Sequence, residues 1–393
     1  MFRPGLLSGQ KKGLIFLFVF SLIPAFLFCS PRGEITVRRK ATMAYFGTVS
    51  QVVVYDNFSR KGALENWENC WNEITGLLAD LETKLSAARP DGDIGRFNAL
   101  SAGSSIAINK ETAEVFILAK ELYEISSAAF NPAVFLLTDL WGYSPRFMLP
   151  VQSRPIMPYD RTGGPTATLP DEKYIQAFAR LADFNHCVLD IDSTGKPVLT
   201  KNGSDEIVDG QKYSLQIDFG GIGKGYAAEK AVEVLVRHGY KYGLVNIGSS
   251  SFQLLERYAD KNDTSDAVFS DPGLWPVNIR SPFDRSATFL TAYGKNEGVS
   301  TSGTYEHNFI IEGRRYSHII DSQTGYPVDG VIESASIIGP GAAWADAATT
   351  ALCVMSSSEA RQFLENHLQN YQVILILSDG SIISNTTRYH LIP

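Results

Sequence analysis

A glycine-rich strand-to-helix connection near the middle of the chain constrains the fold more than any other feature. Residues 217–226 read Ile-Asp-Phe-Gly-Gly-Ile-Gly-Lys-Gly-Tyr, so a strand ends at Asp218, passes a glycine turn and enters a helix beside Lys224. Glycines let backbone amides approach an anion closely, and a helix N-terminus favours negative charge. The spacing matches neither a P-loop nor a dinucleotide-binding Rossmann turn. Taken alone, such a segment is more often a structural turn than a phosphate site.

Three further polar clusters follow at wide intervals. A hydroxyl-rich turn, Ser-Thr-Ser-Gly-Thr-Tyr, occupies residues 300–305. His318 lies in an apolar strand before an Asp-Ser-Gln-Thr-Gly turn, where a single histidine is more often structural than catalytic. Asp346 and Thr350 stand four residues apart and therefore on one face of a helix. Their oxygens are hard ligands suited to Mg2+, although an aspartate near a helix start also serves as a cap.

Hydrophobic periodicity predicts the elements around these clusters. Apolar residues at helical spacing predict helices over residues 63–85, 110–126, 227–238, 343–355 and 358–367. Runs rich in β-branched residues predict strands over residues 48–55, 187–191, 213–219, 243–247 and 275–279. Because these elements follow no strict βαβ repeat, they predict an α+β fold. Prolines and glycines over residues 144–170 predict a long irregular loop.

The N-terminus has the pattern of an export signal. A basic region precedes an uncharged apolar run over residues 13–28, which is shorter than the roughly 20 residues of a membrane-spanning helix. Cys29 follows at once and opens a polar stretch. We expect a lipoprotein signal peptide over residues 1–28, a lipidated Cys29 and a tether over residues 29–42, with plain secretion or an uncleaved anchor as alternatives. The expected location is periplasmic or extracytoplasmic, lipid-anchored to a bacterial membrane.

Charge and cysteine content narrow the function. The formal net charge of -7 argues against nucleic-acid binding. An acidic protein that handles an anionic nucleotide needs local positive charge, which a bound metal can supply. Cys70, Cys187 and Cys353 show no close spacing, so we expect buried thiols rather than disulfides or a thiolate zinc site.

In their combination and order, these motifs resemble those of the ApbE family of FAD:protein FMN transferases. Two earlier segments complete the set, Ser-Ser-Ala-Ala-Phe-Asn-Pro over residues 126–132 and Leu-Trp-Gly-Tyr over residues 140–143. The resemblance covers residues 43–393, essentially the whole mature protein. It implies one catalytic domain with a T-fold-like core of mixed sheet and helices, which binds FAD in a cleft with Mg2+ at the pyrophosphate.

The resemblance also implies roles for individual residues. The magnesium ligands would be the side-chain oxygens of Asp346 and Thr350 and the backbone carbonyl of Gly221. The residues that contact FAD would be Met43, Ala129, Phe130, Asn131, Asp218, Lys224, His318 and Ile319. His318 is the candidate base and Lys224 the catalytic cation. Whether Met43 or Phe46 contacts the flavin stays open.

The implied reaction is an attack on the FMN-side phosphorus of FAD, with AMP as the leaving group. A threonine or serine hydroxyl of an exported acceptor protein would give a phosphoester-linked FMN. Water would give free FMN, which makes the protein an FAD pyrophosphatase. A second alternative is a non-catalytic flavin-binding lipoprotein. A pure binder needs no metal at the pyrophosphate, so Asp346, Thr350 and Lys224 favour an enzyme.

The chain departs from the family pattern at three positions. Asn131 stands where the family usually has an aspartate, so it supplies no carboxylate. Ala88 stands where an aromatic residue is frequent, which opens the flavin pocket to water and raises the hydrolytic alternative. Ser249 stands where a second glycine is usual, which crowds that turn.

Overall fold

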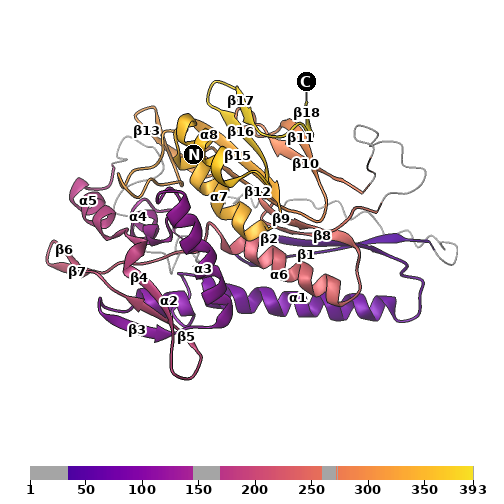
Figure 1. The fold of residues 1–393 in the computed structure, drawn as a ribbon, viewed down its shortest axis with the longest axis horizontal. Coiled ribbons are helices and arrows are strands. Elements are labelled where there is room, and N and C mark those ends of the chain that lie inside the picture. Colours follow the sequence, from indigo (N-terminus) through magenta and orange to yellow (C-terminus); the bar gives the residue numbers. More distant parts are fainter. Residues whose placement is uncertain (1–33, 145–168, 259–270, 272, 393) are drawn as a thin grey trace, which may run out of the picture.

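An eight-stranded sheet forms the centre of the computed structural model, which describes residues 34–144, 169–258, 271 and 273–392 (Figure 1). In order across the sheet, its strands are β1 (Thr36–Tyr45), β2 (Thr48–Asp56), β8 (Tyr242–Ile247), β9 (Ser251–Leu254), β12 (Gly298–Gly303), β15 (Ile332–Gly339), β16 (Gln372–Leu377) and β17 (Ile382–Ser384). Every neighbouring pair in this sheet is antiparallel. This antiparallel sheet, with its separate layer of helices, confirms the predicted α+β class.

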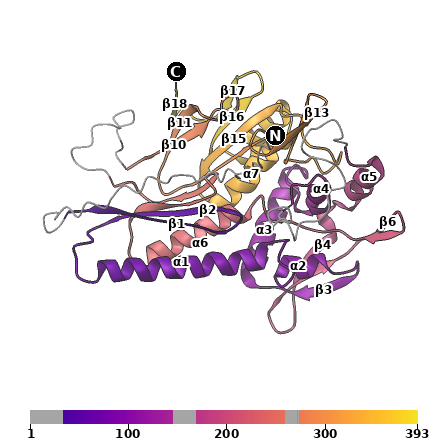
Figure 2. The same ribbon diagram turned by 180° about the vertical axis from the view of Figure 1, so that it is seen from behind.

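Three helices cover one face of the sheet, as Figures 1 and 2 show from opposite sides. They are α1 (Ala63–Leu85), α6 (Gly223–Arg237) and α7 (Ala342–Val354). The bounds of α1 confirm the helix predicted over residues 63–85, and Trp67, Ile74 and Leu78 are among the buried residues that recur at helical spacing. α6 and α7 pack on each other and on strands of the central sheet. The two helices that carry the glycine-turn lysine and the Asp-Thr pair are therefore neighbours.

A three-stranded sheet packs on the opposite face. Its strands are β10 (Trp275–Arg280), β11 (Thr288–Gly294) and β18 (Tyr389–Leu391), in the order β10-β11-β18. An apolar core lies between the two sheets and includes Leu254, Val299 and Ile338 from the large sheet and Ile279, Leu290 and Ala292 from the small one. This packing holds β10 over one end of the central strands.

The remaining elements surround this framework. Those between β2 and β8, other than α1 and α6, are α2 (Asp93–Asn98), β3 (Ser104–Ala107), α3 (Lys110–Ile125), η1 (Pro132–Val134), α4 (Phe135–Leu140), α5 (Glu172–Leu181), η4 (Phe184–His186), β4 (Cys187–Ile191), β5 (Pro197–Lys201), β6 (Glu206–Val208) and β7 (Gln211–Tyr213). Those nearer the C-terminus are β13 (Asn308–Ile311), β14 (Arg314–Ser317) and α8 (Ser357–His367).

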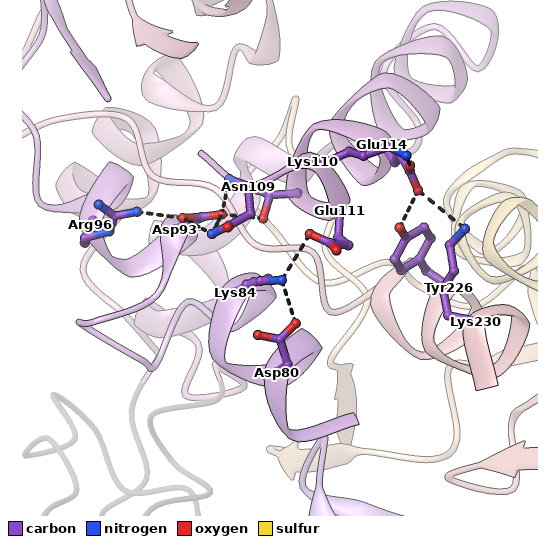
Figure 3. Close-up of polar contacts among 11 residues, drawn as sticks. Asp80, Lys84, Asp93, Arg96, Asn109, Lys110, Glu111, Glu114, Tyr226 and Lys230 are labelled. Atoms are coloured by element: carbon purple, nitrogen blue, oxygen red, sulfur yellow. Dashed lines mark hydrogen bonds and ion pairs between the residues drawn. The ribbon is translucent and has the colours of Figure 1, made fainter. Parts of the chain in front are cut away.

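Polar contacts to α3 fix the helical layer, as Figure 3 shows. The Tyr226 hydroxyl of α6 donates a hydrogen bond of 2.5 Å to Glu114 of α3. Lys84, near the end of α1, lies 3.0 Å from Glu111 of α3. The buried Asp93 carboxylate accepts hydrogen bonds from the backbone and side chains at the start of α3. The Tyr226 contact holds the first turn of α6 on α3, while the Lys84 and Asp93 contacts join α1 and α2 to α3.

The strand predicted over residues 213–219 is wrong beyond Tyr213, where β7 ends. Residues 214–219 belong to no strand, and the side chain of Asn98 takes the place of a partner strand for them. Its Oδ1 accepts from the Ile217 N–H at 2.8 Å, and its Nδ2 donates to the Ile217 carbonyl at 2.8 Å. The Asp218 N–H donates to the carbonyl of Pro132 at 2.8 Å. The backbone before the glycine turn is thus held by one amide side chain and a neighbouring loop.

The predicted tether over residues 29–42 is also corrected, because residues 36–45 form β1 and pair with β2. β1 is an edge strand of the sheet and carries Arg38, Arg39 and Lys40. Charged residues are common on edge strands because they discourage pairing with other chains. These charges are also typical of a polar linker, which is why the sequence predicted a tether here. Cys29, the signal peptide over residues 1–28 and most of the predicted loop over 144–170 lie outside the described residues.

Two further expectations concern the described part of the chain. Cys70, Cys187 and Cys353 are free and buried, as predicted. Burial raises the pKa of each thiol to about 12, so all three stay protonated and unreactive at neutral pH. Within the described ranges, no helix has the length and apolar character needed to cross a membrane.

Candidate active site

A cleft of about 1010 Å³ lies where the glycine turn, α7, β10 and β12 meet. Its volume is at the upper end of the roughly 300–1,000 Å³ usual for small-molecule sites, so it has room for a large ligand. The cleft brings together the predicted residues Ala129, Phe130, Asn131, Asp218, Gly221, Lys224, His318, Ile319, Asp346 and Thr350. Phe46 also lines it, whereas the side chain of Met43 lies outside what the structure describes.

The glycine turn places a carboxylate and an amine on the cleft wall. The Gly220 N–H donates to Asp218 Oδ1 at 2.9 Å, which closes the turn on itself. Burial raises the pKa of the Asp218 carboxyl. At the second residue of α6, Lys224 Nζ donates to the Gly220 carbonyl at 3.0 Å and lies 3.8 Å from Asp346 Oδ2. Lys224 therefore supplies positive charge between the turn and α7.

Asp346 is buried and surrounded by hydrogen-bond donors. Its Oδ2 accepts from the Gly225 N–H at 3.1 Å, and its Oδ1 accepts from the hydroxyls of Ser251 at 3.1 Å and Ser300 at 3.0 Å. α7 begins at Ala342, so Asp346 lies in its second turn and is not the helix cap that the sequence left open. Donors from α6, β9 and β12 thus fix the orientation of one carboxylate.

Thr350 and Gly221 lie beside this carboxylate. Thr350 Oγ1 is 3.3 Å from the Asp346 carbonyl and 3.4 Å from Ser302 Oγ, as expected for residues on one helix face. A Cβ atom placed on Gly221 would lie 3.5 Å from Thr350 Oγ1 and 3.2 Å from the Phe130 ring, so the turn backbone approaches α7 closely. A carboxylate, a hydroxyl and a nearby backbone carbonyl form an oxygen donor set that suits Mg2+, which retains waters and also binds substrate phosphates.

Softer metal chemistry has no such donor set in the described residues. Across those ranges, no group of three or more histidine, cysteine, aspartate or glutamate side chains could hold a metal ion. The carboxylate of Asp346 and the hydroxyl of Thr350 offer oxygen ligands, which hard cations prefer.

The tautomer of His318 follows from its hydrogen bond. His318 Nδ1 lies 3.2 Å from the carbonyl oxygen of His307, which can only accept, so Nδ1 carries the proton and Nε2 keeps its lone pair. Burial lowers the pKa of His318 to about 4, with a smaller contribution from His307. The imidazole is accordingly neutral at neutral pH and can accept a proton at Nε2.

Asn131 has a structural task at the cleft wall. Its amide donates to the Ala182 carbonyl at 2.7 Å and to Ser322 Oγ at 2.9 Å, and its Oδ1 accepts from the Ala133 N–H at 2.9 Å. Both amide hydrogens are therefore used within the protein. These hydrogen bonds hold the Ala182, Ser322 and Ala133 segments together at the cleft wall.

Several residues of the site were not singled out from the sequence. Ser251, Ser300 and Ser302 contact the Asp346–Thr350 pair, and His307 orients His318. The hydroxyl-rich run over 300–305 indicated two of these serines, but the turn predicted there is wrong at residues 300–303, which belong to the strand β12. Ser251 and His307 lie in separate segments without a distinctive motif, so only the fold connects them with the site.

Fold and cleft together describe an α+β protein with a large cleft that contains oxygen donors, a lysine and a neutral histidine. The sequence profile of the ApbE family matches residues 46–375. The chain belongs to the ApbE family, as its motifs predicted.

Known relatives cover most of the chain. It is 29% identical over 328 residues to the FAD:protein FMN transferase of Treponema pallidum, covering 83% of this chain and 81% of that protein. It is 26% identical over 308 residues to the FAD:protein FMN transferase of Escherichia coli strain K12, covering 78% of this chain and 76% of that protein.

Solved structures share the fold. The flavin transferase ApbE from Vibrio cholerae has a TM-score of 0.68 at 20% identity, covering 89% of this chain and 97% of that chain. The ApbE protein from Thermotoga maritima has a TM-score of 0.67 at 21% identity, covering 90% and 98%. The predicted mixed core of sheet and helices is confirmed by these similarities.

Proposed function

We propose that the chain is a Mg2+-dependent FAD:protein FMN transferase. It cleaves FAD to AMP and attaches FMN through a phosphoester bond to a threonine or serine of an exported acceptor protein. The observation that carries the proposal is the buried Asp346 carboxylate, oriented by three donors and placed beside Thr350 in the same cleft as a neutral histidine. The names of the family relatives support the same reaction.

Different residues of the cleft would bind the metal, the phosphates and the flavin. Asp346, Thr350 and the Gly221 carbonyl would hold Mg2+, which neutralises pyrophosphate charge when it is bound. Lys224 Nζ provides a second cation for the phosphates, on the α6 side of Asp346. Phe130 packs against Gly221 and, with Ala129, forms an apolar wall suited to the flavin.

The transfer step needs a base and a leaving group. The acceptor hydroxyl attacks the FMN-side phosphorus, a new O–P bond forms, and the bond from phosphorus to the AMP phosphate oxygen breaks. The hydroxyl proton passes to Nε2 of His318, the nitrogen that the His307 hydrogen bond leaves unprotonated. AMP leaves as an anion, and Lys224 stabilises the charge that develops on it.

Hydrolysis of FAD to FMN and AMP is the second candidate. Ala88 lines the cleft, and its small side chain would open one side of the flavin pocket to water. Water and an acceptor hydroxyl would use the same base and differ only in which oxygen reaches phosphorus. A flavin-binding lipoprotein without turnover remains the third reading, which the same experiment tests.

The proposal includes export and anchoring. The basic region, the apolar run over residues 13–28 and Cys29 support a lipoprotein processed at Cys29 and held at a bacterial membrane. Globomycin, which blocks lipoprotein signal processing, would cause the longer precursor to accumulate. Unchanged processing in its presence would refute the lipid anchor and leave plain secretion or an uncleaved anchor.

The test incubates the full-length chain, purified in mild detergent, with FAD and with or without Mg2+. A library of ten-residue peptides, each with one central threonine or serine, serves as the acceptor. AMP, free FMN and peptide-bound flavin are quantified for the wild type, for Asp346→Asn and for Asp190→Asn. Asp190 is the matched control because it is an exposed aspartate on β4 and does not line the cleft.

Peptide-bound flavin that requires Mg2+ and is lost in Asp346→Asn alone is the expected result. AMP and FMN released without peptide attachment would replace the transferase by the hydrolase. Intact FAD in every reaction, despite measurable binding, would refute both enzymes and leave the flavin binder.

A further inference from the structure

β10 is an edge strand with one free side. It pairs with β11 in the three-stranded sheet and, within the described ranges, no strand pairs with its other edge. An unpaired strand edge presents backbone N–H and C=O groups that can pair with another extended chain. What the free edge of β10 can bind therefore depends on the part of the molecule that borders it.

The free edge of β10 borders the active-site cleft. All six residues of the strand line the cleft, from Trp275 to Arg280. A strand that turned one face to a cavity would contribute only every second residue. Trp275, Val277 and Ile279 pack into the core between the two sheets, and the alternate residues are exposed. The contribution of both sets shows that the strand meets the cleft along its edge.

The direction of the backbone groups can be assigned along β10. The Ser281 N–H donates to the Ala287 carbonyl at 2.9 Å, on the side of β11. The register of β10 on β11 is irregular between Ile279 and Arg280, so the residues before it are assigned from β18. The Tyr293 N–H donates to the Arg388 carbonyl, away from β10, so its partner Pro276, and Asn278 two residues on, direct their backbone groups to the free edge. Proline lacks an N–H and usually lies on an edge strand with that position facing outward, which agrees with Pro276. The Asn278 N–H and the carbonyls of these residues are thus directed to the cleft.

The C-terminal end of β10 connects to the proposed metal site. Arg280 Nη1 lies 3.1 Å from Glu306 Oε1. Glu306 lies three residues beyond the end of β12 and lines the cleft together with Asp346 and Thr350. Within β12, Ser302 Oγ lies 3.4 Å from Thr350 Oγ1. A chain laid along β10 therefore leads toward the Asp346–Thr350 pair. The cleft volume of about 1010 Å³ leaves space for such a segment beside a nucleotide.

We propose that β10 binds the acceptor protein by β-strand addition. An extended segment of the acceptor pairs with the free edge of β10, and its threonine or serine hydroxyl is thereby presented to the FMN-side phosphorus. This inference rests on the proposed transferase function. Backbone pairing supplies affinity for extended chains of many sequences, while alternate side chains of the bound segment face the cleft and set specificity.

The first experiment compares Asn278→Pro with Asn278→Ala in the full-length protein. Both variants lose the side-chain contact with Thr291, whose hydroxyl donates to Asn278 Oδ1 at 2.8 Å. Only proline also removes the N–H that β-strand addition uses. We expect the acceptor KM, measured with the peptide from the ten-residue library that the wild type modifies best, to be about tenfold higher in Asn278→Pro than in Asn278→Ala. FAD affinity, measured in parallel, should differ by less than about twofold between the two variants because the lost group faces the acceptor.

A second experiment needs no change in the protein. The best peptide is resynthesised with a single N-methyl group at each backbone nitrogen in turn. Pairing with β10 predicts that transfer falls at every second position and is retained at the positions between, because only alternate N–H groups face a partner strand.

The outcomes test the transferase function and β-strand addition at β10 separately. Wild-type protein that attaches flavin to no peptide would refute the transferase and this inference together. Wild-type transfer with equal acceptor KM in both Asn278 variants, or with N-methyl effects that show no period of two, would refute β-strand addition and leave the transferase intact. A tenfold difference accompanied by the alternating pattern would establish the docking strand.

Discussion

Replacing Gly225 with alanine tests how closely α6 and α7 must approach to form the site. A Cβ atom on Gly225 would lie 2.1 Å from the Ala342 carbonyl oxygen and 2.5 Å from its carbonyl carbon. Ordinary contact needs about 3.5 Å, so the helices must separate by roughly 1 Å. Overpacking of this kind, with a stretched hydrogen bond to the Asp346 carboxylate, should cost about 2–4 kcal/mol of the free energy of unfolding.

Gly76→Ala is the matched control for this prediction. Gly76 is exposed within α1, and an added Cβ atom would meet nothing within 4 Å. Alanine at this helical position should raise the free energy of unfolding by about 0.5–1 kcal/mol. Urea unfolding followed by tryptophan fluorescence measures both variants, and Mg2+ titration calorimetry should show weaker binding for Gly225→Ala only. Equal stability of Gly225→Ala and wild type would refute the argument from close approach.

Three further predictions concern other positions. Asn131→Asp should lower the free energy of unfolding by about 1–3 kcal/mol at pH 7, because a carboxylate would face the Ala182 carbonyl. The loss should be smaller at acidic pH, where the protonated acid can donate a hydrogen bond to that carbonyl. Urea unfolding midpoints at pH 4 and pH 7 check this. Burial lowers the pKa of Lys201 to about 8 from its ordinary 10.5, so the folded chain releases that proton before the unfolded chain does. Wild-type stability should therefore rise relative to Lys201→Met between pH 8 and 10, by up to about 3 kcal/mol, and parallel unfolding curves at the two pH values would contradict it. Ser249→Gly should stabilise the protein by up to about 1 kcal/mol in thermal unfolding, since Ser249 adopts a left-handed φ of 59°.

Local patterns located the long amphipathic helices, but they missed α2, α4 and α5 and placed the start of α6 four residues late, at residue 227 and not at Gly223. The buried positions of α1 recur at helical spacing, and the sequence alone therefore located residues 63–85. The strand predicted over residues 213–219 was wrong beyond Tyr213 because the partner of this segment lies far away in the sequence. Their apolar character does not reveal whether a backbone pairs with a strand or, as at Ile217, with the amide of Asn98, which is 119 positions away. The sequence did not predict β1 because charged residues are common both on edge strands and in linkers.

The site was predictable in its motifs and not in its supporting contacts. Asp346 and Thr350 lie on one helix face, which their spacing of four dictates. The donors that orient Asp346 come from other elements, and the tautomer of His318 depends on the His307 carbonyl. Which edge of β10 is unpaired and borders the cleft likewise depends on its neighbours in the fold. Such contacts depend on the folded topology, which no short window of sequence contains.

The hydrogen bonds to Asp346 also have a consequence for folding. Its partners Gly225, Ser251 and Ser300 lie 121, 95 and 46 positions away along the chain. Contacts of such long sequence separation form slowly, because chain closure must precede them. A partly folded chain therefore has an incomplete carboxylate site, which is completed only when the last of these segments docks. Ligand binding would then report completed folding, and removing any one of these segments would abolish the site as a whole.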